Sequence, residues 1–186
     1  MPEQPPARSA DAVVRAITRG EVDTYADLRA HALVESPWAF ANAPSEDRTP
    51  DQVRASLDPA TNAIIGVFVL HAKSGAVPQA SPPRLAAITG VVRSTKSKSA
   101  HLAMLWGVYT HPDFRGRGLG RLAVKGAIEA ARAWDGVGGV CLSVSARTEP
   151  AIALYRSLGF REWGREPDAT RIGGESADEV YMRLTL

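Results

Sequence analysis

Two arginines and three glycines fall within the six residues Arg115–Gly120 (RGRGLG), near the middle of the chain. An apolar segment, Leu102–Val108, precedes them, and apolar residues then recur at helical spacing as far as Ala133. A helix that begins in glycines exposes bare backbone N–H groups and the positive end of its dipole. The pattern therefore predicts an anion site at a strand–turn–helix junction, and the two arginines favour phosphate as the anion.

Two common phosphate-binding motifs do not explain this segment. Gly118–Ala123 fits G-x-G-x-x-A loosely, but that dinucleotide motif follows the first strand of a long βαβαβ series. Here a predicted antiparallel meander comes first, only 66 residues follow Gly120, and no strand-end carboxylate stands at the spacing that a ribose needs. The nucleoside-triphosphate loop that ends in Gly-Lys-Ser/Thr does not occur in the sequence either.

The elements around the motif predict a single α/β (α+β) domain. Apolar runs predict strands at 13–17, 63–71, 84–93, 101–110, 140–144, 160–166 and 179–184. Capping residues and helical spacing predict helices at about 23–34, 50–57, 118–133 and 149–158. Residues 1–11, 73–83 and 167–177 are rich in proline or polar groups, so we expect a disordered tail and two loops. Short connections predict an antiparallel meander over 63–110, and the βαβ unit that follows predicts a parallel strand pair.

Composition excludes several classes of protein. The formal net charge of +2, from 22 basic and 20 acidic residues, does not suggest nucleic acid or a membrane surface as a partner. The first residues have no apolar core of a signal peptide, and no apolar run reaches the length of a membrane helix, so we expect a cytoplasmic protein. Cys141 is the single cysteine, which excludes an internal disulfide and a cysteine-rich metal site; we expect no metal.

Two motifs together resemble the GNAT superfamily of N-acetyltransferases. Arg115-x-x-Gly118-x-Gly120 after His-Pro-Asp is similar to the acyl-CoA signature of that family, and Ala151–Phe160 (AIALYRSLGF) is similar to its A-x-x-L-Y-x-x-x-G-F block. The resemblance extends over essentially Val13–Leu186. It implies the GNAT fold for residues 12–186: six to seven strands in one mixed sheet, with an antiparallel meander, a parallel pair splayed at the CoA cleft and about four flanking helices.

The resemblance implies acetyl-CoA as co-substrate. The backbone amides of Arg115–Arg121 would bind its pyrophosphate, and the strand end Val108–Thr110 would hydrogen-bond its pantetheine. Thr148 stands where the family often has an asparagine that contacts CoA. The expected CoA-binding residues are Val108, Tyr109, Thr110, Arg115, Gly116, Arg117, Gly118, Leu119, Gly120, Arg121, Thr148 and Tyr155.

The resemblance also implies catalytic roles. Tyr155 matches a tyrosine that lies near the CoA sulfur, so it would donate a proton to the departing thiolate. The backbone N–H of Tyr109 would stabilise the oxyanion. Many members carry a glutamate on the strand before the pyrophosphate loop, but residues 101–110 contain no acidic residue. The base is therefore open between His101 and Glu179, with Glu35 a weaker candidate and water a further one.

Trp38 and Phe40 lie in the proline-containing segment that follows the first predicted helix. Large aromatic residues in a loop need a surface to pack on, so we expect them either to wall an acceptor pocket or to plug the edge of the core. The pocket would be formed by residues 22–58, the meander loops and the predicted loop 167–177.

The most direct interpretation is an enzyme that transfers acetyl from acetyl-CoA to a primary amine of a small molecule or peptide, by direct attack in a ternary complex. One alternative is a non-catalytic acyl-CoA-binding sensor, which the missing strand glutamate and the threonine at 148 favour. Another is a transferase for a different acyl-CoA, such as succinyl-CoA. We expect a monomer or homodimer with no nucleic acid or membrane partner.

Overall fold

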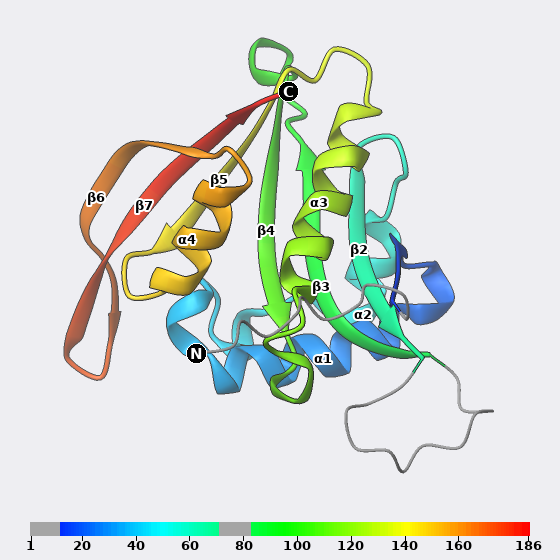
Figure 1. The fold of residues 1–186 in the computed structure, drawn as a ribbon, viewed down its shortest axis with the longest axis horizontal. Helices are drawn as coiled ribbons and strands as arrows, with labels where there is room; N and C mark the ends of the chain where they lie inside the picture. The colour runs from blue at the N-terminus through cyan, green and yellow to red at the C-terminus, as the bar shows by residue number, and fades with distance from the viewer. Residues whose placement is uncertain (1–11, 71–82) are drawn as a thin grey trace, which may run out of the picture.

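The computed structural model describes residues 12–70 and 83–186, and its centre is a mixed sheet with the strand order β1-β2-β3-β4-β5-β7-β6 (Figure 1). The strands are β1 (Ala12–Ala16), β2 (Asn62–Val69), β3 (Arg84–Arg93), β4 (Leu102–Thr110), β5 (Gly139–Ser145), β6 (Arg161–Ile172) and β7 (Glu175–Thr185). The α-helices are α1 (Val22–Glu35), α2 (Pro50–Ser56), α3 (Leu119–Arg132) and α4 (Glu149–Ser157). The meander, the parallel β4–β5 pair and the α-helices agree with the fold expected from the sequence.

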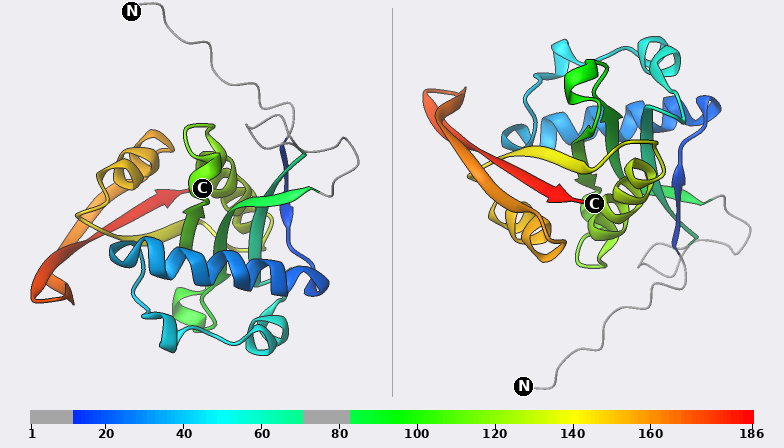
Figure 2. Two further views of the ribbon diagram at one scale, coloured as in Figure 1. Left: turned by 90° about the horizontal axis from the view of Figure 1, so that it is seen from below. Right: turned by 90° about the horizontal axis from the view of Figure 1, so that it is seen from above.

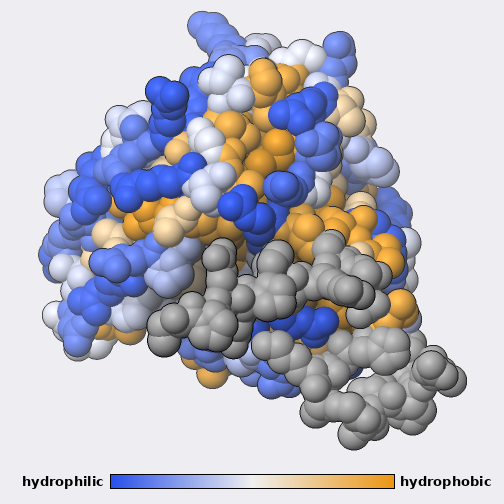
Figure 3. Space-filling model, in the orientation of Figure 1, coloured by the Kyte–Doolittle hydropathy of each residue, from blue (hydrophilic) through white to orange (hydrophobic). Residues whose placement is uncertain are grey.

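Helices cover both faces of the sheet (Figure 2): α3 and α4 lie on one face, and α1 and α2 on the other. Among the described residues, buried apolar side chains form three clusters. Neighbouring side chains of β4 point to opposite faces: Leu105 packs with residues of α3, and Trp106 packs against the cluster that contains residues of α1. Tyr109 joins Trp106 on the α1 side because β4 carries an extra residue between them. On the face drawn in Figure 3, apolar residues gather between α3 and α4 and polar residues surround them.

The strands β4 and β5 pair only at their N-terminal ends. Leu102, Ala103 and Met104 pair with Gly139, Val140 and Cys141, and beyond these pairs the two strands diverge (Figure 1). On the other side of β4, Gly90 pairs with Trp106 and Ile88 with Tyr109, so β4 carries an extra residue there. Gly107, with φ +65°, occupies this bulge. The part of β4 after Met104 therefore has an edge without a neighbouring strand in the described structure.

One prediction was wrong: residues 167–177 do not form a loop. They belong to a long hairpin of β6 and β7 that turns at Gly173–Gly174, both at positive φ. Nearly all of β6 is exposed on both faces, so it lacks the alternation of apolar and polar residues by which a half-buried strand is recognised. Asp168, at φ 53°, lies where the pairing with β7 shifts register.

Three expectations fall wholly or partly outside the described residues: the tail 1–11, most of the loop 73–83 and the end of the strand 63–71 at His71. Within the described ranges, no helix has the length and apolar character needed to cross a membrane.

Candidate active site

A cleft of about 640 Å³ opens between the C-terminal end of β4 and the beginnings of α3 and α4; we call it the glycine-rich cleft. It brings together ten of the twelve residues expected to bind CoA: Val108, Tyr109, Thr110, Arg115, Gly116, Gly118, Leu119, Gly120, Arg121 and Thr148. The two that do not line it are Arg117, whose guanidinium carbon lies 5.8 Å from the centre of the Phe114 ring, and Tyr155. Ser36 and Ala39 add a wall from the other face of the molecule.

Glycine is required at the beginning of α3 for its backbone conformation. Gly116 and Gly118 have φ of +72° and +74°, and Gly118 is the N-cap of the helix. No described side chain caps this end, so its first N–H groups remain available to an anion. A Cβ at Gly120 would stand 3.1 Å from Thr110 Oγ1, so glycine also lets the helix approach the end of β4 closely.

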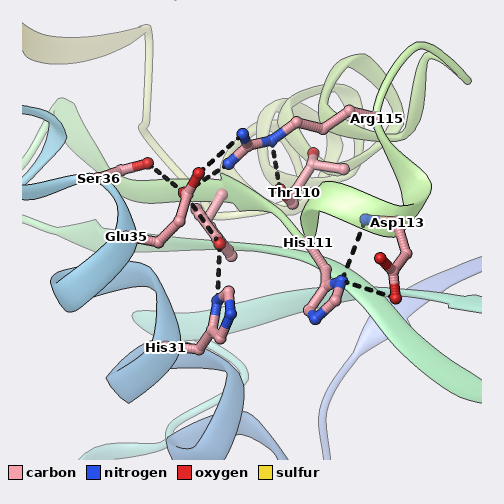
Figure 4. A network of polar contacts seen from close by, with 8 residues as sticks. His31, Glu35, Ser36, Thr110, His111, Asp113 and Arg115 are labelled. Atoms are coloured by element: carbon pink, nitrogen blue, oxygen red, sulfur yellow. Dashed lines mark hydrogen bonds and ion pairs between the residues drawn. The ribbon is translucent and has the colours of Figure 1, made fainter.

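The first arginine of the motif is held by a side chain from α1 (Figure 4). Arg115 Nη1 and Nη2 donate to the two carboxylate oxygens of Glu35 at 2.9 and 2.6 Å, and its Nε donates to the Thr110 carbonyl at 3.1 Å. The Tyr109 hydroxyl donates to Glu35 at 3.2 Å and lies 2.9 Å from His31 Nδ1. Because the hydroxyl has one hydrogen, His31 must carry a hydrogen on Nδ1 to complete this network.

The network changes the acid–base properties of two of its members. Hydrogen bonds from Arg115 are the main cause that lowers the pKa of Glu35 from 4.5 to about 2. Burial, reinforced by the charge of Glu35, raises the pKa of Tyr109 from 10.0 to about 12. Glu35 is therefore a weak proton acceptor at neutral pH, which makes it a poor general base. Its geometry is that of a residue that positions Arg115 and α1 relative to each other.

Tyr155 lies on the inner face of α4, 5% exposed, with its ring 5.8 Å edge-on from that of Phe160. Burial raises the pKa of its phenol above the ordinary value of 10.0. No described residue hydrogen-bonds the Tyr155 hydroxyl. Its oxygen is not completely buried. Tyr155 thus keeps its proton at neutral pH, and its hydroxyl has no hydrogen-bond partner in the described part of the chain.

A second cavity, of about 430 Å³, borders the preceding part of β4, from Met104 to Gly107; we call it the arginine-lined cavity. Arg29 and Arg48 line it from α1 and the α1–α2 segment, and Glu179 lines it from β7. Of the expected acceptor residues, Phe40 lines this cavity and Trp38 does not. The Trp38 ring instead lies 4.1 Å beneath the guanidinium carbon of Arg147, a residue of the glycine-rich cleft.

The two spaces adjoin along β4. Val108–Thr110 line the glycine-rich cleft and Met104–Gly107 line the arginine-lined cavity, and Ala39 contributes to both. Of the two main candidate bases, the structure brings only Glu179 to this region. His101 is an exposed residue before the start of β4, nine residues from Thr110, and it lines neither space. A strand rises about 3.3 Å per residue, so His101 lies roughly 30 Å from that end of β4.

Several residues of the site escaped the sequence-based prediction. The pairing of Arg115 with Glu35, and the contributions of Arg29, Arg48 and Asn62 to the cavity, are seen only in the structure. For Arg29 a signal exists: it shares a helix face with Tyr25, Ala32 and Leu33, which are all buried. A charged residue on an apolar helix face indicates a buried partner or ligand. Among the described residues, no cluster of His, Cys, Asp and Glu has the form of a metal site.

Residues 31–160 match the sequence model of the acetyltransferase (GNAT) family. A methionine sulfoximine/methionine sulfone acetyltransferase of Pseudomonas aeruginosa is 34% identical over 79 residues, which are 42% of this chain and 45% of that protein. A [ribosomal protein bS18]-alanine N-acetyltransferase of Salmonella typhimurium is 43% identical over 60 residues, 32% of this chain and 40% of that protein. The chain thus spans less than half the length of these relatives.

The fold has close counterparts among solved structures. An acetyltransferase of the GNAT family from Streptococcus pneumoniae superimposes with a TM-score of 0.79 at 17% identity, covering 95% of this chain and 100% of that one. At this identity the likeness establishes the fold.

Proposed function

The chain is a member of the GNAT family of acetyltransferases, and we propose that it transfers the acetyl group of acetyl-CoA to a primary amine of a small molecule or peptide. The observation that carries this proposal is that two separate spaces adjoin on consecutive stretches of β4, where β4 has parted from β5. A donor and an acceptor bound in them would meet at a free strand edge. Two relatives support an amine acceptor, since their names describe acetylation of methionine sulfoximine and of a ribosomal protein alanine.

Acetyl-CoA fits the glycine-rich cleft chemically. The uncapped N–H groups at the start of α3 suit its pyrophosphate, because they are fixed donors at the positive end of a helix. The unpaired edge of β4 suits its pantetheine, which can add to the sheet as an extended chain. Arg121, tied to α4 by a 3.0 Å bond from Nη2 to Ser157 Oγ, adds a positive charge to this wall.

Acetyl-CoA supplies an electrophilic thioester carbon and a thiolate leaving group. The amine nitrogen of the acceptor attacks that carbon, the C–N bond forms and the C–S bond breaks. Tyr109 pairs with Ile88, and the bond from His111 N–H to the Ala86 carbonyl indicates that the N–H of Tyr109 also points toward β3. The N–H groups of Val108 and Thr110 face the free edge of β4 instead, and one of them would stabilise the negative charge on the carbonyl oxygen. Glu179 accepts the proton that the amine loses, and Tyr155 donates a proton to the sulfur. We assign the base to Glu179 because it lines the cavity beside β4, which His101 does not.

The test is acetyl transfer by the purified full chain. The protein is supplied with acetyl-CoA and a panel of amino acids, peptides and polyamines, and both free thiol and acetylated amine are measured. We expect at least one amine to be acetylated with equal release of thiol. Tight CoA binding without acetylation of any amine would contradict the proposal and favour an acyl-CoA-binding sensor. Faster turnover of succinyl-CoA than of acetyl-CoA would correct the donor alone.

A further inference from the structure

Arg29 is a buried arginine, and one of its guanidinium nitrogens has no hydrogen-bond partner among the described residues. The residue is 7% exposed, and Asp47 accepts hydrogen bonds from its Nε at 3.1 Å and its Nη2 at 3.3 Å. Its Nη1 is buried and has no partner among the described residues. A buried charged donor without an acceptor is destabilising, so an unpaired guanidinium N–H indicates that something else binds it.

Arg29 Nη1 belongs to a side chain that lines the arginine-lined cavity. This nitrogen lies 3.4 Å from where a Cβ on Gly107 would stand. It therefore lies against the bulge of β4, next to the stretch that borders the glycine-rich cleft. The guanidinium carbon lies 4.5 Å from the centre of the Phe40 ring, so stacking and the bonds to Asp47 fix the plane of the group.

Charges of opposite sign line the cavity on different elements. Arg48 is an exposed residue of the α1–α2 segment, and its guanidinium carbon lies 5.1 Å from the centre of the Trp106 ring. It forms no ion pair with any described residue. The carboxylate of Asp47, its neighbour in the chain, is paired with Arg29. The remaining carboxylate of the lining is Glu179, on β7. Such a cavity matches a ligand that carries both a cation and an anion.

We propose that Arg29 and Arg48 bind a carboxylate on the acceptor, on the carbon next to the reacting amine, so that the substrate is a free α-amino acid. This inference rests on the proposed function and specifies its substrate class. A carboxylate matches the planar donors of a guanidinium. It must be close to the amine, because Arg29 Nη1 lies beside Gly107 and the thioester is expected at the next residues of β4. Phe40, Leu105 and Trp106 provide an apolar wall for the amino acid side chain.

The test compares acceptors that differ only at the carboxylate. Leucine, methionine and phenylalanine are each paired with their C-terminal amides, and kcat/KM is expressed per unprotonated amine, because the amides titrate at lower pH. A hydrogen bond to a charged group is worth enough that we expect the acids to be preferred about 10- to 100-fold. Equal use of acids and amides, or a preference for amides or dipeptides, would overturn the proposal.

Variants attribute the preference to the arginines. Arg29→Lys keeps a cation beside Asp47 but removes the unpaired Nη1 group, so we expect the acid-to-amide ratio of kcat/KM to fall toward one. Arg48→Gln changes an exposed residue and should lower the ratio about threefold, in keeping with a solvent-screened charge. Arg54→Gln is the matched control: it removes an arginine of α2 that lines neither space, and should leave the ratio unchanged.

The variants also separate this inference from the proposed function. CoA affinity and the thermal unfolding temperature of each variant show that the fold and the donor site are intact. If amines are acetylated but Arg29→Lys and Arg48→Gln both keep the wild-type ratio, the arginines do not recognise a carboxylate, although the protein is an acetyltransferase. If neither acids nor amides react while polyamines do, the substrate class is wrong. If no amine of any kind reacts, the proposed function fails and this inference with it.

Discussion

The glycine-rich cleft and the arginine-lined cavity lie side by side on β4 but are built in different ways. Most of the cleft comes from one segment, residues 108–121, and the groups suited to its ligand are largely backbone N–H groups at a helix N-terminus. The cavity takes its walls from α1, the α1–α2 segment, β2, β3, β4, β5 and β7, and the groups suited to its ligand are side chains. Ala39 is the residue common to both walls in the described structure.

This difference separates what the two spaces can recognise. Backbone donors at a helix N-terminus can bind an anion with little dependence on the surrounding side chains, so one local motif is sufficient for an anion site. Recognition by side chains depends on which residues the fold brings together from distant segments. The variants below test whether donor and acceptor recognition are separable in this way, beginning with the largest expected effect.

Gly118→Val should disable the glycine-rich cleft alone. A β-branched residue is strongly disfavoured at the φ of +74° found there, so the N–H groups at the start of α3 would be redirected. We expect CoA affinity, measured by calorimetry, to fall by at least about 100-fold, the loss of two or more charge-assisted hydrogen bonds. Gly136→Val is the control, because Gly136 has a φ of +72° in a turn that lines neither space. Equal CoA affinity in the two variants would contradict the proposal that the backbone N–H groups at the start of α3 bind the pyrophosphate.

Glu179→Gln changes a residue of the arginine-lined cavity and should lower the rate of acetyl transfer without changing the binding of CoA. Loss of a general base lowers rates by about 10²- to 10⁴-fold, so we expect a fall in kcat of about 100-fold with CoA affinity unchanged. Glu162→Gln, on the neighbouring strand and outside both spaces, should leave kcat as it is. A wild-type rate in Glu179→Gln would mean that water or another group takes the proton.

Tyr155→Phe tests the proposed proton donor to the sulfur, a residue that lines neither space. The raised pKa keeps the phenol protonated, and a proton donor to the sulfur should accelerate departure of the thiolate. We expect kcat to fall about tenfold or more, with a smaller loss for a donor whose leaving group is a more acidic thiol. The same kcat in Tyr155→Phe would leave Tyr155 as a packing residue against Phe160.

Glu35→Gln should have the smallest effect, on stability. The ion pair with Arg115 is bidentate but about half exposed on the arginine side, so its loss should lower the free energy of unfolding at pH 7 by about 1 kcal/mol or less. Because the folded-state pKa of Glu35 is depressed from 4.5 to about 2, its contribution is present above pH 4.5 and is lost as the pH falls toward 2. Urea unfolding of wild type and variant should therefore converge over that range. A difference that persists at pH 2 would contradict this origin.

Most of the residues that line the glycine-rich cleft could be named from the sequence because the relevant signals are local. The RGRGLG motif spans the turn before α3 and the start of that helix, and ALYRSLGF covers most of α4 and the residues just after it. The cleft contains ten of the twelve residues expected to bind CoA. The sheet was predictable for a similar reason, since β2, β3 and most of β5 are buried and rich in β-branched residues. The roles assigned to individual side chains, including Tyr155 and Glu179, stay predictions.

The acceptor side and the last hairpin were beyond the sequence for physical reasons. Arg29, Asp47 and Glu179 are far apart in the chain, and no local pattern specifies that their side chains meet one cavity. Nearly all of β6 is exposed on both faces, so its backbone pairing with β7, which no side-chain pattern reveals, defines the hairpin. Of the two aromatic residues proposed for the acceptor wall, Phe40 reaches the cavity, while Trp38 stacks with Arg147.

The short junction between β4 and β5 has a consequence for the dynamics of the molecule. In the described chain, three residue pairs join β4 to β5, whereas seven join β5 to β7. Protein regions linked by few hydrogen bonds can open as separate cooperative units. We therefore expect the amides of β5 and β7 to exchange with solvent together, at a lower free energy than those of β2 and β3. A ligand bound between the diverging ends of β4 and β5 would hold these two strands together and slow the hydrogen exchange of β5 and β7.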